Sequence, residues 1–135
     1  MTGNNTFGKN ERITHRDAIG ELFASGRSFQ QYPLKVIYMP VESSAGPAVQ
    51  VLIAVPKKKF KRAVDRNRIR RMIREAYRLN KKGLLDLVGR SGKNLRIGFV
   101  FIGNEIPATY AEIEDKLAAA IMKLKHIGTD TEDQF

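Results

Sequence analysis

The chain has no cysteine, and none of its 135 residues lies in an apolar run of membrane-spanning length. Without cysteine, disulfide frameworks and thiolate metal sites are excluded, and the composition is compatible with a reducing compartment. A spanning helix needs about 18 or more apolar residues, and the first ten residues also lack the apolar segment of a signal peptide. We therefore expect a cytoplasmic protein with no membrane partner.

Negative charge is scarce as well. The chain holds 24 Lys and Arg against 14 Asp and Glu, which gives a net charge of +10. The last seven residues contribute three acids and no base, so without them the net charge rises to +13. Such a balance favours a polyanionic partner.

The length fits one domain of common size, and no internal repeat is visible. Residues 1–10 are polar and contain glycine, and residues 129–135 are polar and acidic. We predict that both ends are flexible and that residues 11–128 form a single domain.

Two capping boxes mark the outer helices. Thr14 and Asp17 have the spacing of such a box, and apolar residues follow at helical intervals, which predicts a short first helix. Thr109 and Glu112 repeat the pattern before a longer apolar stripe that ends at Gly128.

Three strands are expected from alternating or continuous apolar runs, at residues 34–39, 48–55 and 95–102. Residues 80–94 hold three glycines and predict a loop with a single helical turn around 84–88. The expected fold class is α+β, in the order α-β-β-α-β-α, with one small sheet covered by helices.

The most informative segment is 57–74, where ten Lys or Arg face one acid, Asp65. On a helical wheel the apolar residues Ile69, Met72, Ile73, Ala76 and Tyr77 share one arc, and arginines occupy most of the remainder. Asp65 is the expected N-cap. A solvated surface helix usually mixes charges of both signs, so this one indicates a phosphate-binding face.

The chain offers little for autonomous catalysis. His15 and His126 fall at helix ends and are expected at the surface, and the acidic residues are scattered. We assign no catalytic side chain. The remaining physical role is electrostatic, in which the protein screens repulsion between nucleic-acid strands.

Aromatic side chains beside basic tracks could stack single-stranded bases. The candidates are Phe23, Phe29, Tyr32 and Tyr38, each of which also fits a core position. The lysines at 57–59 are candidates for a phosphate track, with a solvated loop as the alternative.

Residues 61–78, KRAVDRNRIRRMIREAYR, closely resemble the RNR motif of the bacterial ribonuclease P protein component. The motif FxxGRS at 23–28 and the strand with its lysines at 51–58 are similar to that family's first helix, turn and central strand. The resemblance implies the small subunit of a ribonucleoprotein endonuclease that removes the 5′ leader of precursor tRNA. It also implies that the catalytic RNA cleaves with magnesium ions that the RNA mainly holds.

The same resemblance assigns residues to two sites and predicts no protein partner. The residues expected to bind RNA along the RNR helix are Arg66, Asn67, Arg68, Arg70, Arg71 and Arg74. The residues expected in a cleft for the leader strand, between the first helix and the sheet, are Phe23, Tyr38, Lys57 and Lys58. Two features depart from the family pattern, since Ile19 stands where Phe is common and the lysine turn is one residue longer.

Handedness statistics alone predict a right-handed crossover between the two parallel strands, the hand of about 98% of such units. The family has a left-handed crossover, and we expect that hand here. Two other functions stay open at this point. One is a ribosomal or general RNA-chaperone protein of similar fold, and the other is a self-sufficient nuclease.

Overall fold

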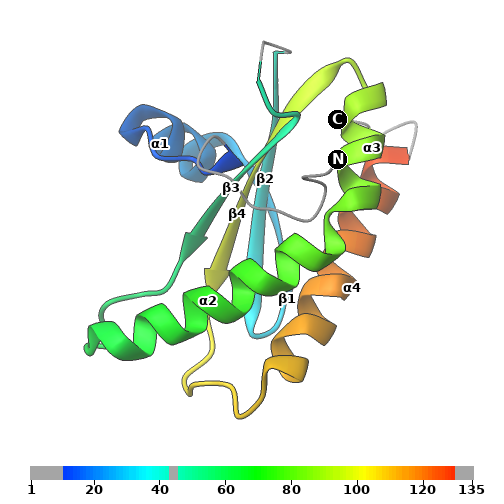
Figure 1. Cartoon of the computed structure of the whole chain (residues 1–135). Coiled ribbons are helices and arrows are strands. Elements are labelled where there is room, and N and C mark those ends of the chain that lie inside the picture. The colour runs from blue at the N-terminus through cyan, green and yellow to red at the C-terminus, as the bar shows by residue number, and fades with distance from the viewer. Residues whose placement is uncertain (1–10, 43–45, 130–135) are drawn as a thin grey trace.

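Figure 1 shows the protein as a computed structural model, which describes residues 11–42 and 46–129. Its elements, in chain order, are α1 (Arg16–Ser25), β1 (Arg27–Gln31), β2 (Leu34–Glu42), β3 (Val49–Ala54), α2 (Ala63–Asn80), α3 (Lys82–Arg90), β4 (Lys93–Phe101) and α4 (Tyr110–Thr129). The α+β class is confirmed, and the six expected elements occur in the expected order with β1 and α3 added. The flexible ends predicted for residues 1–10 and 129–135 lie outside the described residues, apart from Thr129 at the end of α4.

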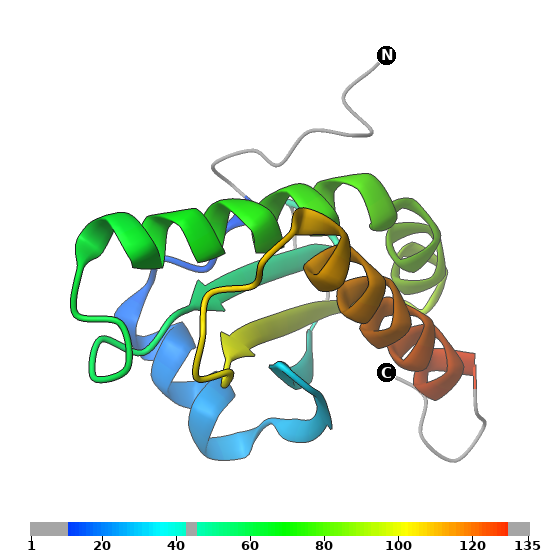
Figure 2. The ribbon, with the colours of Figure 1, turned by 90° about the horizontal axis from the view of Figure 1, so that it is seen from below.

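The four strands form one mixed sheet in the order β1-β2-β4-β3. Strand β2 is antiparallel to both of its neighbours, whereas β3 and β4 are parallel, with Val51 opposite Ile97. The connection from β3 to β4 runs through α2 and α3, and Figures 1 and 2 together show that it is left-handed. The expected hand is therefore present, against the general preference for right-handed crossovers.

The sheet has two unequal cores, because alternate side chains point to opposite faces. On one face, buried residues such as Val36 and Phe99 pack against α2, α3 and α4. On the other face, Ile37 packs with Leu22 of α1 and with Ile13. Figure 2 shows α1 on the far side of the sheet from α4. We call the first the main core and the second the α1 core.

The apolar side of α2, which the helical wheel predicted, is buried. Ile69, Ile73, Ala76 and Tyr77 are fully buried, and the Tyr77 and Phe99 rings lie 5.8 Å apart. Burial of this stripe against the sheet and α4 stabilises the helix far more than its intrinsic propensity can. The opposite side of α2, which carries the arginines, therefore faces outward on a helix whose position is fixed by packing.

The predicted N-cap of α2 is wrong. The helix begins at Ala63 with Arg62 as N-cap, and no side chain caps it. Asp65 lies in the first turn, where its carboxylate is 3.8 Å from Arg62 Nε and complements the helix dipole. The Arg66-Asn67-Arg68 triplet consequently lies one turn further inside the helix than expected.

Of the other two capping predictions, one is wrong and one is confirmed. Helix α1 has His15 as N-cap and no side-chain capping bond, so the box of Thr14 and Asp17 is wrong. At the start of α4, the backbone N–H of Thr109 donates to a Glu112 carboxylate oxygen at 2.8 Å, which confirms that capping box.

The loop predicted for residues 80–94 is also wrong, because nine of its residues form α3. Leu84 and Val88, one helical turn apart, are fully buried, and Gly92 with φ +80° makes the turn into β4. Three glycines in this stretch mask its helical apolar spacing. Strand β1 was missed for another reason, since Phe29 is its one apolar residue and packs at the margin of the main core.

Candidate nucleic-acid interface

The outward side of α2 presents arginines with no acidic partner in the described part of the chain. Arg68 and Arg71 are exposed, and Arg70 and Arg74 are half-buried. The pKa of Arg74 is lowered, first by partial burial and then by the positive charges of Arg12, Arg70 and Arg71. The positive charges of three neighbouring guanidinium groups therefore act on Arg74, which favours an anion beside it.

The side chains of Arg66 and Asn67, in the predicted RNR triplet, make different contacts. Arg66 Nη1 donates to the carbonyl oxygens of Phe60 and Lys61, at 2.7 and 2.9 Å. Asn67 Oδ1 accepts from Arg70 Nη1 at 3.1 Å, which fixes that guanidinium along the helix. Arg66 thus holds the lysine turn against α2, whereas Asn67 orients Arg70.

The lysine turn between β3 and α2 is tied to the rest of the molecule. Lys59 Nζ donates to the carbonyl oxygen of Ile102, 2.9 Å away, which joins the turn to the loop after β4. Phe60 is buried against Phe101, with ring centroids 5.7 Å apart. Lys57 and Lys58 remain exposed on this anchored turn.

The two aromatic residues expected in one cleft are not brought together. Phe23 projects from α1 and is 48% exposed, whereas Tyr38 is 7% exposed in the main core. The Tyr38 ring packs near Phe29, with centroids 6.2 Å apart, on the opposite face of the sheet from α1. Tyr38 therefore cannot line a cleft beneath α1, and its prediction as a cleft residue is wrong. Phe29 is half-buried beneath Lys123 Nζ, and Tyr32 is exposed.

The histidines and the potential metal ligands of residues 11–42 and 46–129 lie as follows. His15 and His126 are both exposed, as expected. Within these ranges, no three His, Cys, Asp or Glu side chains are grouped so that they could hold a metal ion. Among the same residues, no helix is both long and apolar enough to cross a bilayer.

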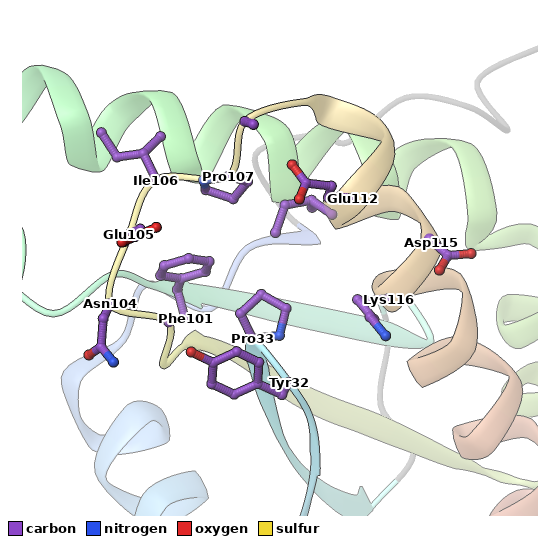
Figure 3. Close-up of a pocket in the computed structure, with 13 residues that line it drawn as sticks. Tyr32, Pro33, Phe101, Asn104, Glu105, Ile106, Pro107, Glu112, Asp115 and Lys116 are labelled. Carbon is purple, nitrogen blue, oxygen red and sulfur yellow. The ribbon is translucent and has the colours of Figure 1, made fainter.

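A pocket of about 800 Å³ opens between the β1–β2 turn and the start of α4. Figure 3 shows Phe101 and Pro33 between the loop that carries Glu105 and helix α4, which carries Glu112 and Asp115. Its lining has three carboxylates against one lysine, Lys116, and this balance disfavours phosphate groups. This pocket is therefore not part of the arginine surface.

Sequence reasoning missed two residues at the arginine surface. Tyr110 packs at the margin of the main core, as expected for the apolar stripe before Gly128, and it also lines a hollow of about 310 Å³ with Arg68 and Arg71. Arg12, which belongs to no motif, is the second such residue. Its positive charge helps to lower the pKa of Arg74. An electrostatic effect between such distant positions leaves no local signal in the sequence.

Comparisons with known proteins point to one family. A family model for ribonuclease P matches residues 7–125. The ribonuclease P protein component of Porphyromonas gingivalis is 36% identical over 126 residues, which cover 92% of this chain and 91% of that protein. The chain belongs to the ribonuclease P protein family. The ribonuclease P protein component of Chlorobium phaeobacteroides is 43% identical over 107 residues, or 73% of each chain.

Solved ribonuclease P proteins share the fold. A mutant of the Staphylococcus aureus protein superimposes with a TM-score of 0.68 at 22% identity, covering 87% of this chain and 90% of that one. The Thermotoga maritima protein gives 0.64 at 21% identity, covering 84% and 96%. As a ribonuclease P protein, the chain is one component of the endoribonuclease that processes the 5′ end of tRNA, and its partner in that enzyme is an RNA.

Proposed function

We propose that this protein binds the catalytic RNA of ribonuclease P through the outward arginines of α2. The observation that supports this most directly is the set Arg68, Arg70, Arg71 and Arg74, held on a packed helix without acidic partners among the described residues. Guanidinium groups at fixed spacing can each contact phosphate oxygens with little loss of side-chain freedom.

We further propose that the precursor tRNA leader lies along the face of the sheet beside α1. Phe23 is the exposed aromatic ring there, and Met39 and Val100 add half-buried apolar surface. Because Ile19 occupies the position where the family commonly has Phe, one aromatic ring rather than two is available from α1 for stacking. Lys57 and Lys58 are proposed to contact the phosphates of the same strand.

In this proposal the protein breaks no bond. The RNA performs the cleavage, and magnesium ions are held mainly by RNA phosphates. The arginines and lysines reduce the repulsion between the catalytic RNA and the precursor, so that less magnesium is needed to bring the two together.

Reconstitution with the RNA subunit from the same genome tests the proposal. Leader removal should be stimulated at low magnesium by the wild-type protein, and much less by an Arg68→Gln, Arg71→Gln double variant. The holoenzyme should also bind precursor tRNA more tightly than mature tRNA.

Two outcomes favour the alternatives. Equal affinity for precursor and mature tRNA, with no stimulation of cleavage, would indicate a general RNA chaperone or ribosomal protein. Leader removal by protein alone, after rigorous removal of RNA, would indicate a self-sufficient nuclease.

A further inference from the structure

A polar pocket of about 420 Å³ opens beside α1. One of its sides is formed by Arg12 and Ile13, which belong to residues 11–13, the N-terminal strap. The strap is fixed to the edge strand β3, because the N–H of Ile13 donates to the carbonyl oxygen of Val51 at 3.0 Å. The pocket volume lies within the range of about 300 to 1,000 Å³ that is usual for sites of small ligands.

Two neighbouring residues of the sheet contribute the amide and the guanidinium of the pocket. Gln50 of β3 lies opposite Arg96 of β4, and both line the pocket. Leu52, two residues after Gln50, packs in the α1 core, so Gln50 and Arg96 are on the face of the sheet that α1 covers.

The charged groups of the lining balance one another. Asp17 and Glu21 of α1 bring two carboxylates, and Arg12 and Arg96 bring two guanidinium groups. With His15 neutral, these charges cancel. Such a lining suits a neutral group that carries both donors and acceptors better than it suits a phosphate.

Arg96 has hydrogen-bonding capacity that the protein does not use. Its Nη1 donates to Glu21 Oε1 at 3.0 Å, but the Glu21 side chain is 63% exposed. An ion pair this open to water contributes little to stability, so a ligand can replace it. Arg96 Nε is buried and has no hydrogen-bond partner among the described residues. A small rotation of the guanidinium toward the pocket would present both nitrogens to a ligand.

We infer that this pocket binds the guanine base of an unpaired RNA nucleotide. Guanine has two acceptors, N7 and O6, that match the paired donors of Arg96. It also has two adjacent donors, N1–H and the N2 amino group, that match the carboxylate of Asp17 or Glu21. No other standard base combines these two acceptors with two adjacent donors. The inference rests on the proposed function, since it adds a base contact to a protein that binds RNA.

The pocket is separate from the surface proposed for the leader strand at Phe23. On a helical wheel, Asp17 lies about 120° and Glu21 about 160° around α1 from Phe23. The two sites therefore flank α1 on different sides. The guanine belongs either to the catalytic RNA or to a part of the precursor tRNA that does not stack on Phe23.

Titration of the full-length protein with GMP, AMP, CMP and UMP, followed by NMR, tests the base preference. The four nucleotides carry the same phosphate, so differences among them report the base. GMP should shift the amide signals of Gln50 and Arg96 and bind about tenfold more tightly than the other three. IMP, whose base lacks the N2 amino group, should bind about tenfold more weakly than GMP, because it loses one hydrogen bond to a carboxylate. Equal affinity for all five nucleotides would overturn the site.

Variants then test the assigned residues. Arg96→Gln should abolish the preference for GMP, whereas Arg90→Gln, at an exposed arginine that ends α3, should keep it. The double variant Asp17→Ala, Glu21→Ala changes only exposed side chains of α1, so it tests the site even if Arg96→Gln does not fold. It should bind GMP and IMP equally. A wild-type preference for GMP over IMP in the double variant would contradict the role of the carboxylates.

Two RNA assays identify the source of the base. If the double variant binds the isolated RNA subunit more weakly, the guanine belongs to that RNA. A loss seen only when the holoenzyme binds precursor tRNA assigns the guanine to the precursor. Full affinity in both assays would overturn the inference, because the guanine would then come from a free nucleotide. The proposed function is judged separately, by whether the wild-type protein stimulates leader removal.

Discussion

The ammonium group of Lys81 lies 2.8 Å from the Glu11 carboxylate, although 70 residues separate the two in the chain. The Lys81 side chain is 2% exposed and that of Glu11 14% exposed, so the pair is almost removed from water. Lys81 Nζ also lies 6.0 Å from the centroid of the buried Tyr77 ring. A charge at this depth requires its partner, and the strap therefore depends on this contact.

Replacing Lys81 or Glu11 should lower the stability of the protein. Lys81→Met removes this ion pair from a Glu11 carboxylate that is only 14% exposed, and we expect a loss of about 3 kcal/mol in the free energy of unfolding, near the lower end for a broken buried pair. Lys82→Met is the matched control, because Lys82 is exposed at the start of α3. Urea denaturation of the protein alone measures both. Equal losses in the two variants would contradict the importance of the pair.

Stability should also fall in alkali through Tyr77. Burial, and secondly the Glu11 charge, raise the pKa of Tyr77 above its usual value near 10. Above that pH the unfolded chain loses the Tyr77 proton while the folded chain keeps it, so the free energy of unfolding decreases by up to about 1.4 kcal/mol per pH unit.

The Tyr77→Phe variant should lack this contribution, so its stability relative to wild type should improve between about pH 10 and 11. Tyr32→Phe, at a position 59% exposed, should follow the wild-type curve. Unfolding measured in urea at several pH values compares the three proteins. Parallel curves for wild type and Tyr77→Phe would exclude the effect.

The arginine side of α2 could be predicted from the sequence, whereas the face of the sheet that α1 covers could not. The apolar period of Ile69 and Ile73 lies within one helix, so the arginine side of α2 is predictable from the sequence alone. The alternation over residues 34–39 predicts that Leu34, Val36 and Tyr38 share one face of the sheet, and all three lie in the main core. Alternation does not say which face of the sheet α1 covers, however, and Tyr38 was therefore assigned to the wrong face.

The interactions that were missed connect distant segments. Glu11 pairs with Lys81, and residues 12 and 13 lie along β3, where Arg12 pairs with Val51. Neither interaction produces a periodic pattern or a local motif. Capping also differed from expectation at two helices, because packing of α1 and α2 on the sheet fixes their starts without a side-chain cap.

For the arginine surface, we expect Arg68→Ala to weaken binding of the RNA subunit and to lower the salt slope by about 0.7 to 0.9. Arg68 is exposed and its removal leaves the buried side of α2 intact, so folding should not change. Arg62→Ala provides a control on the same helix, since Arg62 is paired with Asp65 at the N-cap. Binding titrations over a range of salt give both slopes. A slope unchanged by Arg68→Ala would remove this residue from the interface.

For the leader strand, Phe23→Ala should reduce the preference of the holoenzyme for precursor over mature tRNA. Loss of one stacked base corresponds to about 1 to 3 kcal/mol. Met122→Ala is the control, because Met122 is 54% exposed on α4, away from the α1 face. Competition between the two tRNA forms measures the preference. If both variants keep the wild-type ratio, Phe23 makes no contact with the leader.

Gly26, between α1 and β1, should tolerate no side chain. A Cβ there would lie 2.5 Å from the Leu22 carbonyl oxygen and 2.7 Å from Ile37 Cγ2, so α1 would have to shift on the sheet. Gly26→Ala should cost about 1 to 3 kcal/mol of stability. Gly20→Ala, in the same helix with nothing within 4 Å, should instead gain about 0.5 to 1 kcal/mol.

The same pair of variants separates the two proposed RNA contacts. A displaced α1 should lower the preference for precursor tRNA, whereas binding of the isolated RNA subunit should persist, because the arginines of α2 lie on a helix packed against the main core. Gly20→Ala should leave both measurements unchanged. If Gly26→Ala weakened both kinds of binding equally at a temperature where it is fully folded, the leader and the catalytic RNA would share one surface instead of two.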